Sequence, residues 1–434
     1  MRIYLILIII LIIGCTSQQQ TKIENKTEAK SSSMDLPENG SETNISQPFM
    51  YEKKDNESIV PIVQPPPKQT EQNLSKTDHI KNSGRFSFGK PCSWEGAVNF
   101  TSPPRRLEDI GLIEPIGLMI GNHVTPIDHG YYYPSNWKHE DNPIEFKDVL
   151  APANGIITEI ETMGGRKDDY RLVIHYTCTF YTIYIHVKEL SPRIKQFYGG
   201  MEFKNGKGIN VTAGEVIGRA NAFDFSVHDD NVVLKGFITP KLYEGESWKI
   251  HTVDMFAYFV EPIKSQLLAK NIREKEPRGG KIDYDIDGKL VGNWFVENSG
   301  GYAGLNRGID NYKTHLAFAY DGLDPSLVVV SMGNFNNEPK QFAVINNKPD
   351  PISIDKSDGI IKYELVDIDY MIQGTGEYWD RRNYAKGIKA IGRGDVLGVV
   401  LVQMIEDRKI KFEVFPGKTA SEVNGFSNPK IYER

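Results

Sequence analysis

Cysteine is scarce in this chain, with three residues among 434, and basic side chains are not in excess. The 51 Lys and Arg against 57 Asp and Glu give a formal net charge of −6. Without a basic surplus, nucleic acid is not expected as a partner, because binding to phosphate depends on clustered cations. Aromatic residues make up 11% of the chain, which argues against a mostly disordered protein. The length therefore allows two or three folded domains.

Long apolar runs are also missing, apart from one at the start. Residues 3 to 13 are apolar except for Tyr4, but a membrane-spanning helix needs about 20 such residues. The run has the length of the apolar part of a secretory signal, and we expect residues 1–14 to be a signal peptide. A buried N-terminal strand is the alternative, which the polar sequence that follows disfavours.

Gly14-Cys15 at the end of this run resembles a lipoprotein signal box. That resemblance implies cleavage before Cys15 and lipidation of its side chain, which would attach the protein to a membrane. The sequence therefore predicts an exported protein anchored to the outer face of the cell membrane or cell surface. Cys92 and Cys178 then remain as a pair in an oxidising compartment, and we predict a disulfide between them. Two separate buried thiols are the alternative.

Composition divides the rest of the chain. Residues 15–83 are rich in Ser, Thr, Asn, Lys and Glu without hydrophobic periodicity, which predicts a flexible polar tether. Residues 84–270 show short strand patterns separated by turns, and 281–434 show a second set, with a linker predicted at 271–280. The fold class predicted is mainly β, with an antiparallel sheet domain followed by a separate C-terminal β-rich domain. Acceptor sequons for N-glycosylation recur, one of them at Asn210.

Histidines and carboxylates gather in the first of these domains. His123, Asp128 and His129 fall within seven residues, and imidazole and carboxylate are ligands that zinc accepts. Alone, this stretch favours a loop held by hydrogen bonds to Asp128 over a metal site. Further along, His175 and His186 end two strand patterns.

Several segments in chain order resemble the lysostaphin-type zinc endopeptidases, exported enzymes that cut peptide bridges in cell-wall peptidoglycan. The resemblance covers roughly residues 115 to 230 and rests on short motifs. These are the His123–Asp128 stretch, Ala151-Pro152-Ala153-Asn154-Gly155, Tyr184-Ile185-His186 and Ala213-Gly214-Glu215-Val216-Ile217-Gly218. It implies an antiparallel sheet with a metal on one face. His123 and Asp128 match the first two zinc ligands of the family, and His186 matches the histidine that positions or activates water.

The closing H-x-H motif of the family is absent. Its two positions fall on Ala222 and Asp224, so the resemblance implies a metal set of His123, Asp128 and Asp224. Four residues rather than three separate His123 from Asp128. Because of this extra residue, His129 could be the ligand in place of Asp128. His175 and His228 are further alternates, although His228 lies about 13 Å along the strand from Asp224. Alternation places His186 with Thr182 and Tyr184, on the face we expect for Asp224.

Two functions follow as expectations. The first is a surface-anchored lipoprotein whose peptidase-like domain is degenerate and binds a surface polymer or protein at the cell envelope. The second is an active zinc metalloendopeptidase with a His/Asp/Asp site, in which His186 is the catalytic residue. A third possibility places the function in residues 281–434.

Overall fold

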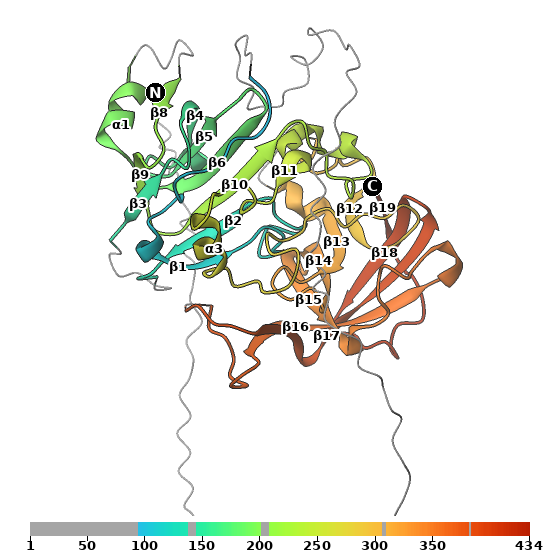
Figure 1. Ribbon diagram of the computed structural model, residues 1–434. Helices are drawn as coiled ribbons and strands as arrows, with labels where there is room; N and C mark the ends of the chain where they lie inside the picture. Colours follow the sequence, from blue (N-terminus) through green and yellow to red (C-terminus); the bar gives the residue numbers. More distant parts are fainter. Residues whose placement is uncertain (1–93, 138–144, 201–207, 306–309, 382) are drawn as a thin grey trace, which may run out of the picture. The chain divides into compact units, whose positions relative to one another are not determined.

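The computed structural model describes residues 94–137, 145–200, 208–305, 310–381 and 383–434 (Figure 1). The predicted signal peptide, Cys15, the tether and Cys92 lie outside these residues. All described residues belong to one compact unit. In this part of the chain no helix has the length and apolar character needed to cross a membrane.

The N-terminal half is built on a large antiparallel sheet whose strand order is β1-β2-β10-β6-β5-β4-β8, with β11 paired to β10. Its strands are β1 (Ile110–Glu114), β2 (Gly130–Pro134), β4 (Gly155–Thr162), β5 (Tyr170–His175), β6 (Phe180–Val187), β8 (Ile209–Val211), β10 (Phe223–Asp229) and β11 (Thr252–Val253). A small sheet in the order β3-β9-β7 accompanies it, formed by β3 (Lys147–Leu150), β7 (Glu189–Leu190) and β9 (Val216–Ala220).

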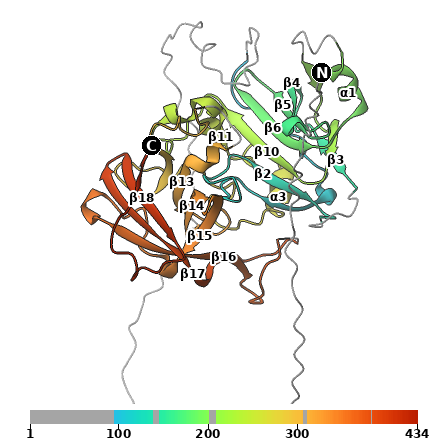
Figure 2. The same ribbon diagram turned by 180° about the vertical axis from the view of Figure 1, so that it is seen from behind.

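The C-terminal half is a closed barrel of consecutive antiparallel strands (Figure 2). The strands are β12 (Gly292–Val296), β13 (His315–Tyr320), β14 (Val328–Phe335), β15 (Glu338–Val344), β16 (Ile361–Ile372), β17 (Ile388–Glu406), β18 (Lys409–Pro416) and β19 (Lys430–Glu433). Apolar side chains such as Trp294, Phe318 and Tyr363 fill its core. The prediction of a mainly β, antiparallel chain is confirmed.

Helices are few and short. The α-helices are α1 (Pro192–Tyr198) and α3 (Ile263–Leu268), and the 3-10 helices are η2 (Leu107–Asp109), η3 (Met163–Gly165), η4 (Pro240–His251), η5 (Asn311–Thr314), η6 (Ile345–Asn347) and η7 (Lys356–Asp358).

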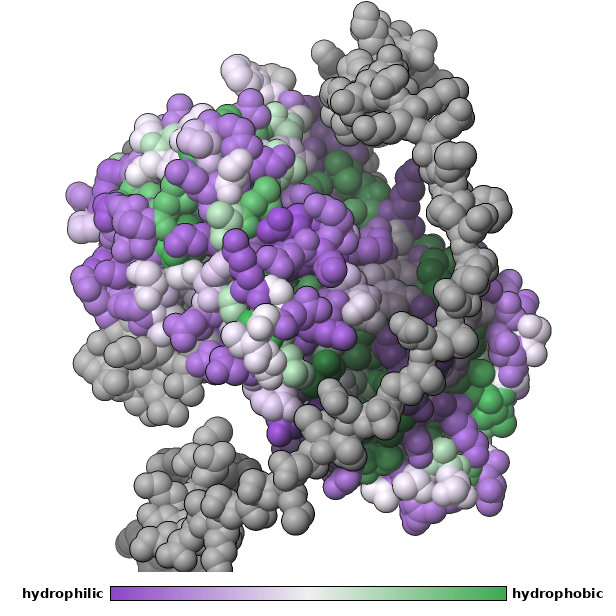
Figure 3. Space-filling view, turned by 60° about the horizontal axis from the view of Figure 1, so that its bottom comes forward, coloured by the Kyte–Doolittle hydropathy of each residue, from purple (hydrophilic) through white to green (hydrophobic). Residues whose placement is uncertain are grey.

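The strand β17 is much longer than the mostly apolar stretch 396–404, which forms only its second half. Glycines and charged residues at 392–395 have low β-propensity, so the sequence pattern does not indicate the first part of this strand. Pairing of residues 388–393 with β16, beyond a bulge at residues 394–397, holds this part extended. On the face shown in Figure 3, hydrophilic residues dominate, and apolar residues gather in smaller separate areas.

Candidate functional site

Three neighbouring strands bring the predicted site residues together. β10 lies between β2 and β6, and Asp224 on β10 pairs with Tyr131 on β2 and Ile185 on β6 (Figure 1). His129 immediately precedes β2, so the end of this loop arrives beside Asp224. His186 is near the end of β6, one residue beyond the partner of Asp224.

The two faces of β10 differ as the sequence predicts. Phe223, Phe225 and Val227 belong to the main hydrophobic core, and the intervening Asp224, Ser226 and His228 lie on the opposite face. That second face is also buried, with Asp224 only 5% exposed. The side chain of His228 lies against η4, at hydrogen-bond distance from the carbonyl oxygen of Trp248.

His186 reaches this polar face by a different route from the one predicted. Tyr184 packs in the main core and pairs with Phe225, so strict alternation would direct His186 into the core. Instead, the β5–β6 pairing shifts register between Tyr170 and Leu172, and His186 has a φ of +69°. A bulge of this kind turns a side chain to the other face, and positive φ is strained for a residue with a Cβ. The expectation that His186 shares a face with Asp224 holds, but the reason given by alternation was wrong.

The imidazole of His129 lies between two carboxylates. Its Nδ1 is 3.1 Å from Oδ1 of Asp128, and its Nε2 is 3.5 Å from Oδ2 of Asp224. All three residues are at most 8% exposed. Burial alone would lower the pKa of His129, but Asp224 and Asp128 together raise it. His129 therefore bridges two of the three residues predicted to hold the metal.

A second histidine–carboxylate pair faces the same aspartate. Nδ1 of His186 lies 3.0 Å from Oδ1 of Asp169, and its Nε2 lies 3.8 Å from Oδ2 of Asp224. Burial would raise the pKa of Asp169, but hydrogen bonds from Lys188 and His186 lower it. Asp169 thus orients the His186 ring while the other ring nitrogen faces Asp224.

Charge around this cluster is balanced by a buried lysine. Lys249 is completely buried, and its Nζ donates a hydrogen bond of 2.6 Å to the carbonyl oxygen of Pro126. Burial would raise the pKa of Asp128, but Lys249 and His129 hold it well below its usual range. The pKa of His123 is lowered to about 3, first by burial and then by His129 and Lys249. His123 is therefore a neutral imidazole, and its ring centre lies 5.3 Å from that of His129.

Burial also raises the pKa of Asp224, against the opposing effects of His129 and His186. The alternates His228 and His175 have other hydrogen-bond partners. Nε2 of His228 is 2.7 Å from Oγ of Ser226, and Nδ1 of His175 is 2.8 Å from Oγ1 of Thr158. Tyr181 stacks between the two imidazole rings.

The residues predicted to hold zinc do not fit a zinc ion in this arrangement. Zinc ligands converge at about 2 Å on one point, whereas Asp128 and Asp224 are directed at the two ring nitrogens of His129. Among the described residues, no group of three or more His, Cys, Asp or Glu is arranged to hold a metal ion.

Sequence reasoning missed Asp169 and Lys249. Asp169 lies before β5 and Lys249 in η4, and neither belongs to a local motif that includes a histidine. Only the pairing of β5 with β6 and the packing of η4 place them in the cluster. His129 had a local signal, its position beside Asp128, but was considered only as a substitute ligand.

No family model matches the chain, and no curated protein matches it. Solved structures of lysostaphin are similar, one titled as the antimicrobial peptidase from Staphylococcus simulans and one determined by NMR. Each is 10% identical, with a TM-score of 0.24 over 78% of this chain and 92% of lysostaphin. A chain of the SpoIIQ–SpoIIIAH pore-forming complex is 13% identical, with a TM-score of 0.24 over 39% of this chain and 96% of that chain.

Proposed function

We propose that this chain is an exported lipoprotein, anchored to the outer face of a membrane through lipid on Cys15, with a degenerate peptidase-like domain. In this proposal the domain binds a polymer or protein of the cell envelope and does not cut it. The sequence motifs supply the peptidase-like assignment, and the signal box supplies the location.

One observation carries the degenerate assignment. His129 lies between Asp128 and Asp224, so two of the residues that match metal ligands contact an imidazole instead. Lys249 adds a buried cation beside Asp128. Side chains of this protein therefore satisfy the carboxylates that a metal would otherwise neutralise.

A zinc endopeptidase is the second candidate, and the geometry of His186 favours it. A histidine that is bound to a carboxylate through one ring nitrogen and faces the site with the other is typical of metal centres and of acid–base catalysts. Its side chain is 42% exposed, so a substrate could reach it.

The deciding experiment measures zinc in the purified full chain after incubation with zinc and gel filtration. We expect wild-type protein to retain far less than one equivalent. The variant His129→Ala should retain more, because Asp128 and Asp224 lose the imidazole between them. His251→Gln is the matched control, since that imidazole contacts the carbonyl oxygen of Val232 outside the cluster. Circular dichroism checks that each variant is folded.

Hydrolysis of purified peptidoglycan and binding to it are measured with the same protein samples. The proposal expects co-sedimentation without release of soluble fragments. Stoichiometric zinc in wild-type protein that is lost in Asp224→Ala, together with fragment release, would contradict the proposal and establish the peptidase.

A further inference from the structure

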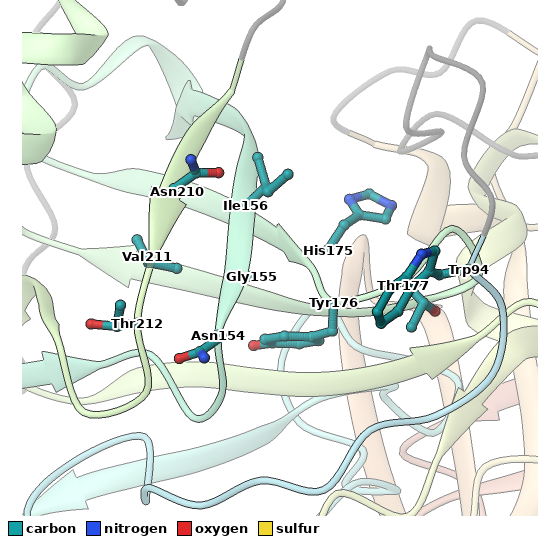
Figure 4. A pocket seen from close by; sticks show the side chains of 10 residues that line it. All are labelled: Trp94, Asn154, Gly155, Ile156, His175, Tyr176, Thr177, Asn210, Val211 and Thr212. Atoms are coloured by element: carbon teal, nitrogen blue, oxygen red, sulfur yellow. The ribbon is translucent and has the colours of Figure 1, made fainter.

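A pocket of about 410 Å³ lies at the end of the sheet remote from His186, beside the β5–β6 turn. Its walls come from β4, β5, β8 and the chain around Trp94 (Figure 4). The volume falls in the range of about 300–1,000 Å³ that is usual for small-molecule sites. The cluster around His129 and Asp224 does not reach this pocket, although Asn154 and Gly155 at the end of the Ala151–Gly155 motif line it.

Aromatic rings form one part of the pocket wall. Trp94 is 74% exposed, an unusual state for the largest apolar side chain. The Tyr176 ring is held in place by an edge contact with Phe100 and by a bond of 2.7 Å between its hydroxyl and Oγ1 of Thr182. A Cβ at residue 155 would come within 2.9 Å of the Tyr176 ring, so glycine at this position avoids a steric clash with the ring.

Neutral polar groups line the other side. Asn154, Asn210 and Thr212 are exposed and contribute amides and a hydroxyl. Oδ1 of Asn154 accepts a hydrogen bond of 2.9 Å from the amide of Ala213, which leaves the NH₂ group to donate elsewhere. Among the described residues that line the pocket there is no Asp, Glu, Lys or Arg.

From this combination we infer that the pocket binds a neutral sugar ring of a glycan chain. The apolar face of a pyranose matches an exposed indole, and its hydroxyls match amide and hydroxyl side chains. A charged ligand would lack a counter-charge in the lining. The inference rests on the proposed binding function and names the chemistry of the surface polymer.

The pocket is far enough from the histidine cluster to be tested separately. Tyr181, beside His175 at the pocket end, lies five residues from His186 on β6, or roughly 16 Å at about 3.3 Å per residue. Changes at Trp94 should therefore leave the cluster intact.

The test titrates the full chain with two neutral oligosaccharides, cellohexaose and chitohexaose, and follows tryptophan fluorescence and heat. Saturable binding of at least one is expected. Trp94→Ala should weaken it by about tenfold or more, about 1.4 kcal/mol, and Asn210→Ala should weaken it as well. Phe197→Ala removes a ring that is 41% exposed on α1, outside the pocket, and should not change the affinity.

The absence of saturable binding, or equal binding by wild type and Trp94→Ala, would overturn the inference. A glycan attached to Asn210 in the native protein, seen by mass spectrometry, would also overturn it, because the side chain would then be a modification site. Co-sedimentation with peptidoglycan that Trp94→Ala leaves unchanged would reject this pocket and keep the proposed function. Oligosaccharide binding without co-sedimentation would keep this pocket as a sugar site and reject the proposed binding function.

Discussion

At the scale of single residues, the chemistry of this protein depends on how buried histidines are partnered. His129 is hydrogen-bonded to Asp128 and lies 3.5 Å from a carboxylate oxygen of Asp224, whereas His228 is at hydrogen-bond distance from Ser226 and from the carbonyl oxygen of Trp248. Burial lowers the pKa of His228 to about 4, although Asp128 and the Trp248 carbonyl oppose it, whereas Asp224 and Asp128 raise the pKa of His129 in spite of its burial. The same residue type is thus a bridging group in one place and a neutral structural group in another.

His315 in the barrel provides a prediction on pH. Burial lowers its pKa to about 4, and its Nε2 donates a hydrogen bond of 2.9 Å to the carbonyl oxygen of Tyr302. Between about pH 6.5 and pH 4 the unfolded chain binds a proton that the folded chain does not, so the free energy of unfolding falls as the pH falls. We expect His315 to account for about 2 kcal/mol of that loss between about pH 7 and pH 5.

Urea denaturation at the two pH values checks this. His315→Gln should flatten the pH dependence, and His79→Gln, in the predicted tether, should leave it unchanged. An equal pH dependence in His315→Gln and wild type would show that the imidazole is not the titrating group.

At the scale of secondary-structure elements, one irregularity decides the composition of the candidate site. The bulge in β6 turns His186 from the core face to the face of Asp224. Alternating patterns in the sequence predict the strands of the N-terminal half well, for example β6 at 180–187 in the large sheet and β9 at 216–220 in the small one. They do not predict the bulge, because an extra residue in a strand leaves no compositional signal here.

The positive φ of His186 gives the second prediction. A Cβ at this backbone conformation costs on the order of 1 kcal/mol, and glycine avoids the cost. His186→Gly should therefore be more stable than His186→Ala by about 1 kcal/mol in urea denaturation. Glu189 on β7 is the matched control, since its φ is not positive and Glu189→Gly should be less stable than Glu189→Ala. The same order at both positions would contradict the bulge.

At the scale of the whole described unit, the hairpin formed by β16 and β17 contacts the first sheet. Arg381, in the loop between these strands, donates a hydrogen bond of 2.8 Å to Oε1 of Glu114 on β1. The hydroxyl of Tyr133 donates to Oε2 of the same carboxylate at 3.0 Å. Around this pair, Leu112, Ile127 and Trp379 form a small hydrophobic cluster that joins the two halves. The two β-rich regions are therefore in contact within one compact unit.

Breaking this ion pair should destabilise the protein. The Glu114 side chain is 2% exposed and that of Arg381 28%, so Glu114→Gln should cost about 2–3 kcal/mol, below the range for fully buried pairs. Glu145→Gln, whose side chain is 71% exposed beside Lys147, should change stability by less than about 0.5 kcal/mol. Urea denaturation measures both, and adding Arg381→Met to Glu114→Gln should cost less than the two single changes summed. Equal effects of Glu114→Gln and Glu145→Gln would refute the role of the contact.

The predicted disulfide also belongs to this scale. The amide of Cys178 donates a hydrogen bond of 2.8 Å to the carbonyl oxygen of Trp94, which follows Cys92 by two residues in the sequence. Cys92 itself lies outside the described residues, so the pairing stays a prediction.

The sequence by itself determined the fold class, most strands and the candidate residues His123, Asp128, Asp224 and His186, because these depend on local alternation and short motifs. Tertiary structure alone decided how they combine. The order β2-β10-β6 sets His129 between two aspartates, the bulge turns His186 toward Asp224, and packing of η4 brings Lys249 close to Asp128. Such contacts join residues as far as 123 positions apart, such as Lys249 and Pro126, and burial then shifts their pKa values. Neither effect leaves a trace in the local pattern.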